Sequence, residues 1–144
     1  MNLNKIFLLG RLTRDPEMRN LPSGQKVCLF GLATDRYFIN KEGKKQQETE
    51  FHNIVLFGRL AEISFQYLKK GALVLIEGRI KTRTWQDNQG NKRSRTEVIA
   101  ERIQLAPKSL SKETSSQKET TKEEIPIIEE EKEEEEINLE DLPF

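Results

Sequence analysis

Apolar and polar residues alternate along much of the first hundred residues, which is the pattern of half-buried β-strands. In residues 5–12, for example, Ile6 and Leu8 would lie on one face, and Phe7 and Leu9 on the other. Residues 21–24 (LPSG) have the composition of a tight turn, with proline second and glycine fourth. We therefore predict strands over five segments: residues 5–12, 25–39, 49–57, 72–85 and 91–105.

The hydrophobic period changes after Gly58, where Leu60, Ile63 and Tyr67 recur at spacings of three and four. That spacing predicts an amphipathic helix over residues 60–68, which Gly71 ends. The order is then three strands, one short helix and a two-stranded hairpin. A simple antiparallel meander needs no helix between its third and fourth strands. The order therefore predicts an all-β fold with one short helix, the OB-fold, a five-stranded Greek-key barrel.

The apolar pattern stops after Pro107. Residues 108–121 contain almost no apolar side chains, and residues 129–136 are acidic except for Lys132. On a helix, these glutamates would repel one another at spacings of four. We predict that residues 1–106 form the folded domain, and that residues 107–144 form a disordered acidic tail.

The formal net charge of zero conceals opposite charges on these two parts. Residues 1–108 contain 20 Lys and Arg against 11 Asp and Glu, a net charge of +9. Residues 109–144 contain 4 against 13, a net charge of −9. A basic domain favours a polyanionic partner and an acidic tail disfavours one, so we expect the two parts to have different functions.

The residue types exclude several kinds of site. Cys28 is the only cysteine and His52 the only histidine, which leaves no disulfide within the chain, no cysteine-based zinc site and no pair of histidine ligands. No glycine-rich phosphate loop is present either. We expect no cofactor and no metal. The apolar run from Ile6 to Leu9 is too short for a signal peptide or a membrane span, so we expect a cytoplasmic protein.

The predicted strand over residues 72–85 gives the clearest indication of function. Its apolar even positions should face the core: Val74, Ile76 and Ile80. Its odd positions carry three cations and an indole: Arg79, Lys81, Arg83 and Trp85. Cations contact phosphates and an exposed ring stacks on a base, so this face favours nucleic-acid binding. A solvated strand face with one isolated tryptophan is the alternative.

Aromatic residues on two other predicted strands extend this pattern. Phe51 and Phe57 share a face because they are six residues apart, and Tyr37 stands just before a turn. Phenylalanine is usually a core residue, so each of these rings alone also fits a structural role. Together with Trp85, rings interleaved with basic residues suit unpaired bases better than a duplex, whose base faces are hidden. Single-stranded nucleic acid is therefore the expected partner.

Four motifs carry a family resemblance: NKIFLLGRLTRDPEMR, TEFHNIVLFGRLAE, YLKKGALVLIEGRIKTRTWQD and the ending EDLPF. No one of them is specific alone, but together they are highly specific. Through them the chain resembles the bacterial-type single-stranded DNA-binding protein family. The resemblance runs from about residue 3 to residue 105 and returns at the C-terminal tip.

The resemblance implies an OB-fold, a homotetramer around which DNA wraps, and a nucleoid-associated protein. Its implied function is sequence-independent binding and protection of single-stranded DNA during replication, recombination and repair. The stacking rings would be Tyr37, Phe51, Phe57 and Trp85. The phosphate contacts would be Arg79, Lys81, Arg83, Arg93 and Arg95. The family often has tryptophan at the first two ring positions and arginine at Asn53, so these departures bear on affinity more than on function.

Residues 139–144 form an apolar tip on a highly charged segment. Such an end is more simply a ligand for another protein than a buried element, and Phe144 would offer both a ring and the terminal carboxylate. The resembled family ends in Asp-Asp-Ile-Pro-Phe and recruits replication, recombination and repair proteins in this way. A generic solubilising tail is the alternative. The predicted partner-binding residues are Glu140, Asp141, Leu142, Pro143 and Phe144.

Three other functions fit parts of the sequence. A small nuclease would need an acid–base pair, but His52 lies on the face opposite Phe51 and is expected at a core or subunit contact. An RNA-binding OB-fold protein would have a similar ring and cation face, but no evident need of EDLPF. A pure interaction scaffold would leave the basic aromatic face unexplained. We therefore predict a non-catalytic protein that binds single-stranded DNA.

Overall fold

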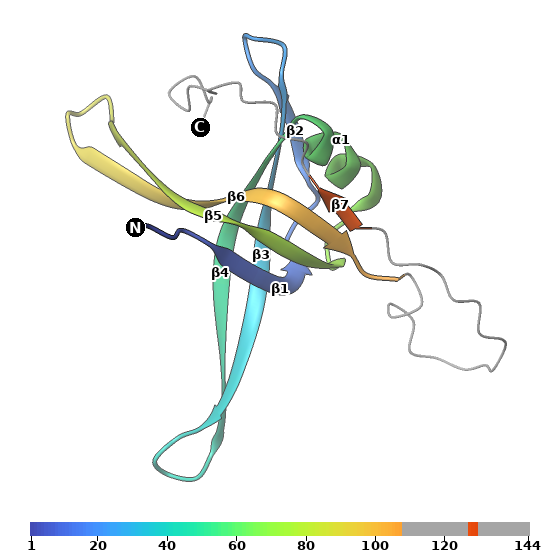
Figure 1. Cartoon of the computed structure of the whole chain (residues 1–144). Helices are drawn as coiled ribbons and strands as arrows, with labels where there is room; N and C mark the ends of the chain where they lie inside the picture. Colours follow the sequence, from blue (N-terminus) through green and yellow to red (C-terminus); the bar gives the residue numbers. More distant parts are fainter. Residues whose placement is uncertain (108–126, 130–144) are drawn as a thin grey trace, which may run out of the picture.

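A computed structural model of the protein describes residues 1–107 and 127–129. Its strands are β1 (Ile6–Leu12), β2 (Glu17–Asn20), β3 (Lys26–Ile39), β4 (Lys45–Phe57), β5 (Leu73–Gln86), β6 (Lys92–Leu105) and β7 (Ile127–Glu129), and its helix is α1 (Gly58–Tyr67). The strand order is β1-β5-β6-β4-β3-β2, and a further pairing of β1 with β3 closes a barrel (Figure 1). This closed barrel with one short helix confirms the predicted OB-fold.

The barrel closes through β1, which pairs with β5 along most of its length and with β3 at its end. The register there places Arg11 opposite Ala33. Gly10 lies at this crossing, and a side chain on it would collide with the carbonyl oxygen of Ala33. On the opposite side, β4 and β6 run parallel and pair at Ile54 and Val98. Glycine at the crossing therefore permits the close approach that closure requires.

The core lies inside the barrel and under α1. The residues that share it include Leu12, Cys28, Phe30, Leu32, Ile54, Leu56, Leu60, Ala61, Val74, Ile76 and Ile103. Burial raises the pKa of the Cys28 thiol to about 12. The prediction that Val74 and Ile76 face the core is confirmed. The same prediction for Ile80 is wrong, because this side chain lies farther along β5 and is 42% exposed.

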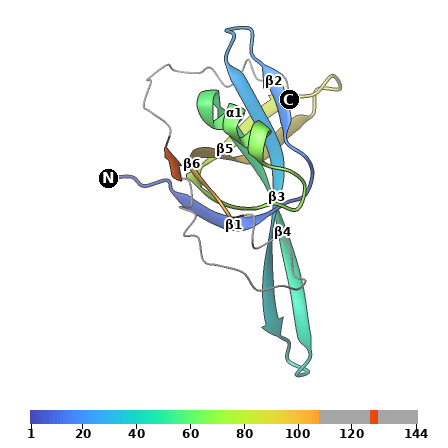
Figure 2. The same cartoon turned by 90° about the vertical axis from the view of Figure 1, so that its right-hand side faces the viewer.

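Helix α1 covers one end of the barrel, beside β2 and β3 (Figure 2). It buries Leu60, Ala61 and Ser64 and leaves its other side in solvent. The predicted helix is confirmed, although it begins earlier, at Gly58. Gly58 has a φ of 59°, which lets the chain turn from β4 directly into the helix. No helix within the described residues is long and apolar enough to cross a membrane.

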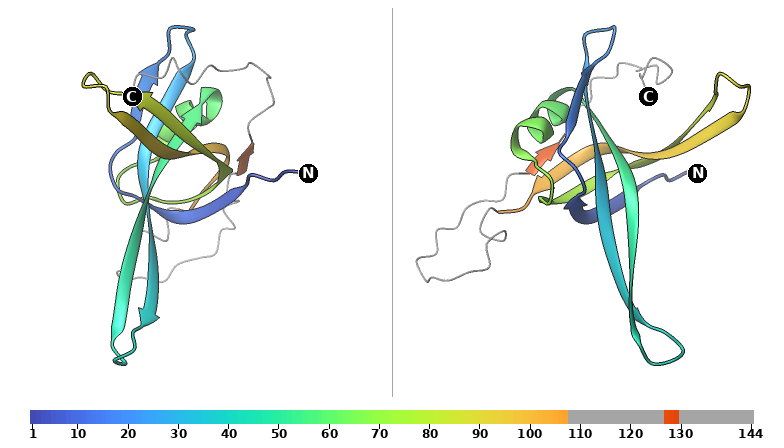
Figure 3. Two further views of the ribbon diagram at one scale, coloured as in Figure 1. Left: turned by 90° about the vertical axis from the view of Figure 1, so that its left-hand side faces the viewer. Right: turned by 180° about the vertical axis from the view of Figure 1, so that it is seen from behind.

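Strands β3, β4, β5 and β6 are 13 or 14 residues long, which is more than the barrel wall uses. The β3–β4 and β5–β6 hairpins therefore project from the barrel in different directions (Figure 3). The tip of each hairpin is closed by a side chain that accepts two backbone N–H bonds: Asn40 in the first and Asp87 in the second. The turns at these tips are formed by residues 40–43 and 87–90.

Two short strands were not predicted. Strand β2 pairs with the start of β3, opposite Val27 and Cys28. Strand β7 pairs antiparallel with β6, with Ile128 opposite Ile103. Since β4 leaves β6 after Ile99 and turns into α1, an edge of β6 is available to β7. Of the predicted disordered tail, residues 107–144, the described residues 127–129 form β7, and residues 108–126 and 130–144 lie outside the described residues.

Candidate nucleic-acid interface

The odd-numbered residues of β3 and β4, of β5 from residue 79 onward and of β6 up to residue 99 lie on one face of a continuous sheet, which we call the outer face. Paired residues of neighbouring strands project to the same side. The register pairs Ala33 with Phe51 between β3 and β4, and Val55 with Ile99 between β4 and β6. It pairs Lys81 with Glu97 between β5 and β6. All the stacking and phosphate-binding residues predicted from the sequence therefore belong to this face.

The part of the outer face nearest the barrel is closed by a second apolar cluster, which we call the outer cluster. Its members are Leu21, Val27, Leu29, Val55, Phe57 and Ile99. Phe57 is only 4% exposed within it. The Phe57 ring is therefore not open to solvent: it packs with residues such as Leu21, Val27 and Ile99, and its stacking role stays a prediction. The cluster instead fixes how the two hairpins leave the barrel.

The other three predicted rings are exposed. Tyr37 is 72% exposed and Phe51 is 71% exposed, both on the β3–β4 hairpin. Trp85 is 39% exposed on the β5–β6 hairpin, where its ring lies over the Arg83 guanidinium at 5.3 Å from centroid to Cζ. The outer face thus presents aromatic surface on both projecting hairpins, on either side of the outer cluster.

Four of the five predicted phosphate-binding cations are already in ion pairs. Arg79 lies 3.9 Å from Glu101, and Arg93 lies 3.2 Å from Asp87. Arg83 and Arg95 both contact Glu97. Lys81 forms no ion pair with any residue that the structure describes. Ion pairs at exposed sites are weak and exchange readily, so Arg79 and Arg93 are still able to contact a phosphate.

Glu97 is the residue of this face that the sequence analysis missed. Its side chain is 2% exposed, and its Oε1 atom lies 3.1 Å from Arg83 Nη2 and 3.5 Å from Arg95 Nε. Arg83 is itself only 14% exposed. Asn53 accepts a hydrogen bond of 2.9 Å from Arg95. The sequence did contain a signal: Glu97 follows Arg95 by two residues, so in a strand both side chains lie on the same face.

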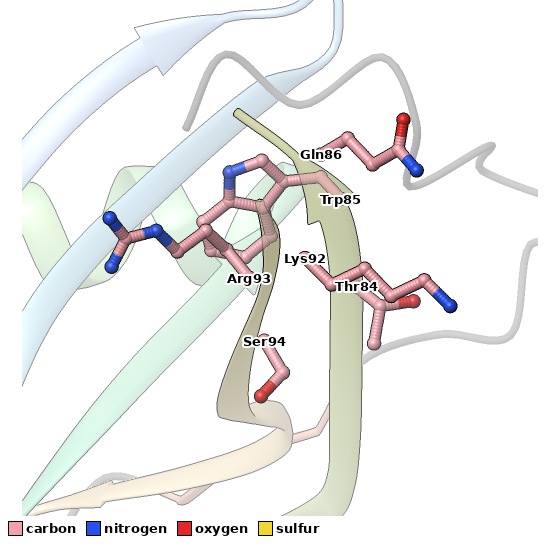
Figure 4. Close-up of a pocket in the computed structure, with 6 residues that line it drawn as sticks. All are labelled: Thr84, Trp85, Gln86, Lys92, Arg93 and Ser94. Carbon is pink, nitrogen blue, oxygen red and sulfur yellow. The ribbon is translucent and has the colours of Figure 1, made fainter. Parts of the chain in front are cut away.

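The end of the β5–β6 hairpin forms a shallow pocket of about 390 Å³. Figure 4 shows the Trp85 and Arg93 side chains on one side of the hairpin, and those of Gln86 and Lys92 on the other. The turn is held by Asp87, whose pKa is lowered mainly by the backbone N–H of Asn91, with further help from Arg93. The pocket therefore combines an aromatic wall, cations and amide or hydroxyl groups, the types of group that contact bases and phosphates.

Other candidate chemistry is sparse. His52 is partly buried on the side of β4 opposite Phe51 and lies 2.9 Å from the Thr34 hydroxyl. The described residues contain no group of three or more His, Cys, Asp or Glu side chains that could hold a metal ion. The acids near the outer face are engaged locally: Asp35 accepts a hydrogen bond from Thr49, Asp87 holds the turn, and Glu97 pairs with arginines.

Comparison with known proteins gives a consistent result. A model of the single-strand binding protein family matches residues 3–106. The single-stranded DNA-binding protein of Neisseria meningitidis serogroup A is 45% identical over 105 residues, which are 73% of this chain and 60% of that protein. That of Wolinella succinogenes is 49% identical over 102 residues, or 71% of this chain and 63% of that protein. The chain therefore spans less than two thirds of the length of these curated relatives.

Solved structures extend the similarity to the backbone. A Plasmodium falciparum SSB complex with ssDNA is 32% identical, with a TM-score of 0.66 over 69% of this chain and 88% of that chain. A deletion mutant of the single-stranded DNA binding protein from Thermus aquaticus is 36% identical, with a TM-score of 0.66 over 74% of this chain and 51% of that chain.

Proposed function

The chain belongs to the single-strand binding protein family, and from this premise we propose that it binds single-stranded DNA through its outer face, without regard to sequence. The observation that carries the proposal is the presence of three exposed rings and several cations on one face of one sheet. Stacking on such rings contributes roughly 1–3 kcal/mol per base and tolerates every base, a range drawn partly from this family itself. A duplex hides its base faces and gains no such contact.

Within this face we assign two kinds of contact. Tyr37, Phe51 and Trp85 stack on bases, while the buried Phe57 supports the surface from below. Lys81 contacts phosphates most readily because no described residue competes for it. Arg79, Arg93 and Arg95 contribute through ion pairs that a phosphate can replace. Arg83 is the least accessible of the five cations.

We propose that the protein acts by binding and protecting DNA in replication, recombination and repair, and has no catalytic activity of its own. The acids of the outer face support this reading because each has a structural partner. We further propose that residues 139–144 recruit other proteins, with Glu140 and Asp141 engaging basic residues and Leu142, Pro143 and Phe144 entering an apolar pocket. A nucleoid-associated, cytoplasmic location follows from these proposals.

A homotetramer is the proposed assembly. Phe7 and Leu9 support it, because they are 64% and 61% exposed on the side of β1 that faces away from the core. Neighbouring apolar side chains that are this exposed on a barrel wall are typical of a protein–protein contact. Light scattering with and without a long oligo-dT measures the subunit number and the DNA stoichiometry together. A monomeric mass in both samples would contradict the tetramer and leave the DNA-binding proposal standing.

The test of DNA binding is a titration that follows the fluorescence of Trp85, the only tryptophan. We expect tight binding of oligo-dT, with quenching, and weak binding of a duplex of equal length. Oligo-rU serves as the third ligand, because preferential binding of RNA would favour an RNA-binding function. Equal affinity for duplex and single strand would overturn the proposal.

The tail gives two further tests. Residues 109–144 have a net charge of −9 and residues 1–108 a net charge of +9, so we propose that the tail competes with DNA. Its removal should raise oligo-dT affinity at low salt and much less at high salt. Unchanged affinity at low salt would contradict the competition.

The second test concerns the C-terminal residue. Deleting only Phe144 should leave oligo-dT affinity unchanged and abolish the capture of repair and replication proteins. A chain that lacks Lys132 is the control.

A further inference from the structure

Glu97 has a position that neither stacking nor phosphate binding explains. It is a nearly buried carboxylate in the middle of a face that is expected to attract a polyanion. Burial of a charge is costly unless it is paired, and here two guanidinium groups pair with it. The register places Arg83 directly opposite Arg95, an arrangement of like charges that is unfavourable across two strands. Glu97, one step back along the same face, relieves that repulsion.

The same contacts lead to the tryptophan. The Arg83 guanidinium is 3.1 Å from Glu97 on one side and 5.3 Å from the centre of the Trp85 ring on the other. A cation at that distance attracts the ring face. On the far side of Glu97, Arg95 donates to the Asn53 amide oxygen and so connects β6 with β4. The row Asn53–Arg95–Glu97–Arg83–Trp85 thus runs from the barrel wall to the exposed indole.

We propose that Glu97 is a positioning residue: it holds Arg83 beneath the Trp85 ring and thereby sets the orientation in which the indole meets a base. The proposal rests on the proposed function in that the base is one of single-stranded DNA. Without the carboxylate, Arg83 would lose its 3.1 Å ion pair while still facing Arg95, so its guanidinium would no longer be held against the Trp85 ring. The Trp85 ring would then lose the group against which it packs.

A simpler role for Glu97 makes the opposite prediction. If the carboxylate only lowers the positive charge of the face, its neutralisation strengthens DNA binding, most of all at low salt. If Glu97 positions Arg83 and Trp85, its neutralisation weakens DNA binding although the face gains positive charge. The sign of the change therefore separates the two roles.

The experiment uses the full chain with Glu97→Gln. In the free protein, we expect Trp85 to become more accessible to acrylamide and its emission to shift to longer wavelength. With oligo-dT, we expect affinity to fall by about fivefold or more, which is the lower part of what one stacked base contributes. Glu97→Asp keeps the charge and should restore part of both signals. A gain in affinity with an unchanged Trp85 signal would overturn the proposal.

Asp35→Asn is the matched control. It removes the same charge from an exposed residue of the same face, and Asp35 contacts Thr49 rather than an arginine. We expect it to leave the Trp85 signal unchanged and not to weaken oligo-dT binding. If Asp35→Asn weakens binding as much as Glu97→Gln, the effect is not specific to Glu97 and the proposal fails.

A second variant covers the case in which Glu97→Gln does not fold, as judged by circular dichroism. Arg83→Lys keeps the charge but not the planar group that contacts the ring, and it should reproduce the Trp85 signal change. Unchanged accessibility in Arg83→Lys would overturn the proposal. The two levels of inference remain separable: if the wild-type chain fails to bind oligo-dT while these variants still alter Trp85, the proposed function is wrong, and only the placement of Arg83 against Trp85 by Glu97 stands.

Discussion

The two stretches of the outer face use the same strands and the same alternation, but they end in opposite states. Beside the barrel, Val27, Val55 and Phe57 are sealed within the outer cluster. On the hairpins, Tyr37 and Phe51 stand in solvent on the same side of the same strands. The two stretches differ in exposure because other residues of the outer cluster pack over the first, whereas Tyr37 and Phe51 on the second are open to solvent. Aromatic residues in phase with one another are therefore buried at one end of the face and exposed at the other, where we propose the binding surface.

The largest expected effect separates the two stretches by stability. Phe57→Ala should lower the free energy of unfolding by about 3–5 kcal/mol, because it removes a buried ring and leaves a cavity. Phe51→Ala should change it by no more than about 0.5 kcal/mol, because the ring is exposed. Urea unfolding followed by circular dichroism measures both variants at one protein concentration. Similar unfolding midpoints for the two variants would contradict a structural role for Phe57 that Phe51 lacks.

The second effect separates them by binding. Trp85→Ala should weaken oligo-dT affinity by about 1–3 kcal/mol, the contribution of one stacked base. Phe51→Ala should act in the same direction, and the two losses should add because the rings lie on different hairpins. Anisotropy of a labelled oligo-dT measures affinity without the tryptophan signal. If neither variant loses affinity while both stay folded, the exposed rings do not form the binding surface.

A smaller effect concerns the cations of the open stretch. Lys81→Gln should reduce the slope of log affinity against log salt by about 0.7, the value for one phosphate contact on a single strand. Lys26→Gln is the matched control, because Lys26 pairs with Glu62 and lies off the outer face. We expect it to change the overall charge equally and leave the slope unaltered. Equal slopes in the two variants would mean that only net charge matters.

The smallest effect is local and depends on pH. The lowered pKa of Asp87 means that its carboxylate stabilises the β5–β6 turn. That stabilisation is complete above the ordinary aspartate pKa and is lost as pH falls through the lower, folded-state pKa. Amide signals of Gln89 and Asn91 should therefore shift in strong acid, whereas the outer cluster should be unaffected at the onset. Asp87→Ala, which removes the acceptor, should already show the shifted signals at neutral pH.

The sequence was sufficient to predict which residues share a face. Alternation is a local property of a strand, and it grouped Trp85 with Arg79, Lys81 and Arg83 correctly. The helix and the strand order that define the barrel were likewise local patterns. Whether a stretch of strand is buried depends on residues far away in the sequence, and the wrong expectations for two residues reflect this. Ile80 was expected in the core although β5 has passed beyond it, and Phe57 was expected in solvent although distant segments close over it.

The remaining misses have the same origin. In the sequence nothing distinguishes Glu97 from the other acidic residues. The structure shows that it lies between Arg83 and Arg95. Strand β7 was hidden in an acidic segment because its pairing depends on an edge of β6 that only the folded barrel creates. Charge and composition describe average surroundings, whereas both features depend on a particular neighbour. Contacts between residues far apart in the sequence are therefore what the structure added.

The pairing of β7 with β6 has a geometric consequence for the far end of the chain. Measured from the end of the described domain, residues 108–144 are 37 residues, an extended length of about 130 Å. Measured from β7, residues 130–144 are 15 residues, or about 50 Å. Pairing of β7 with β6 thus shortens the length of chain available between the barrel and the C-terminal residues. While β7 stays paired, a protein that binds Phe144 as proposed above would lie within that shorter distance of β7.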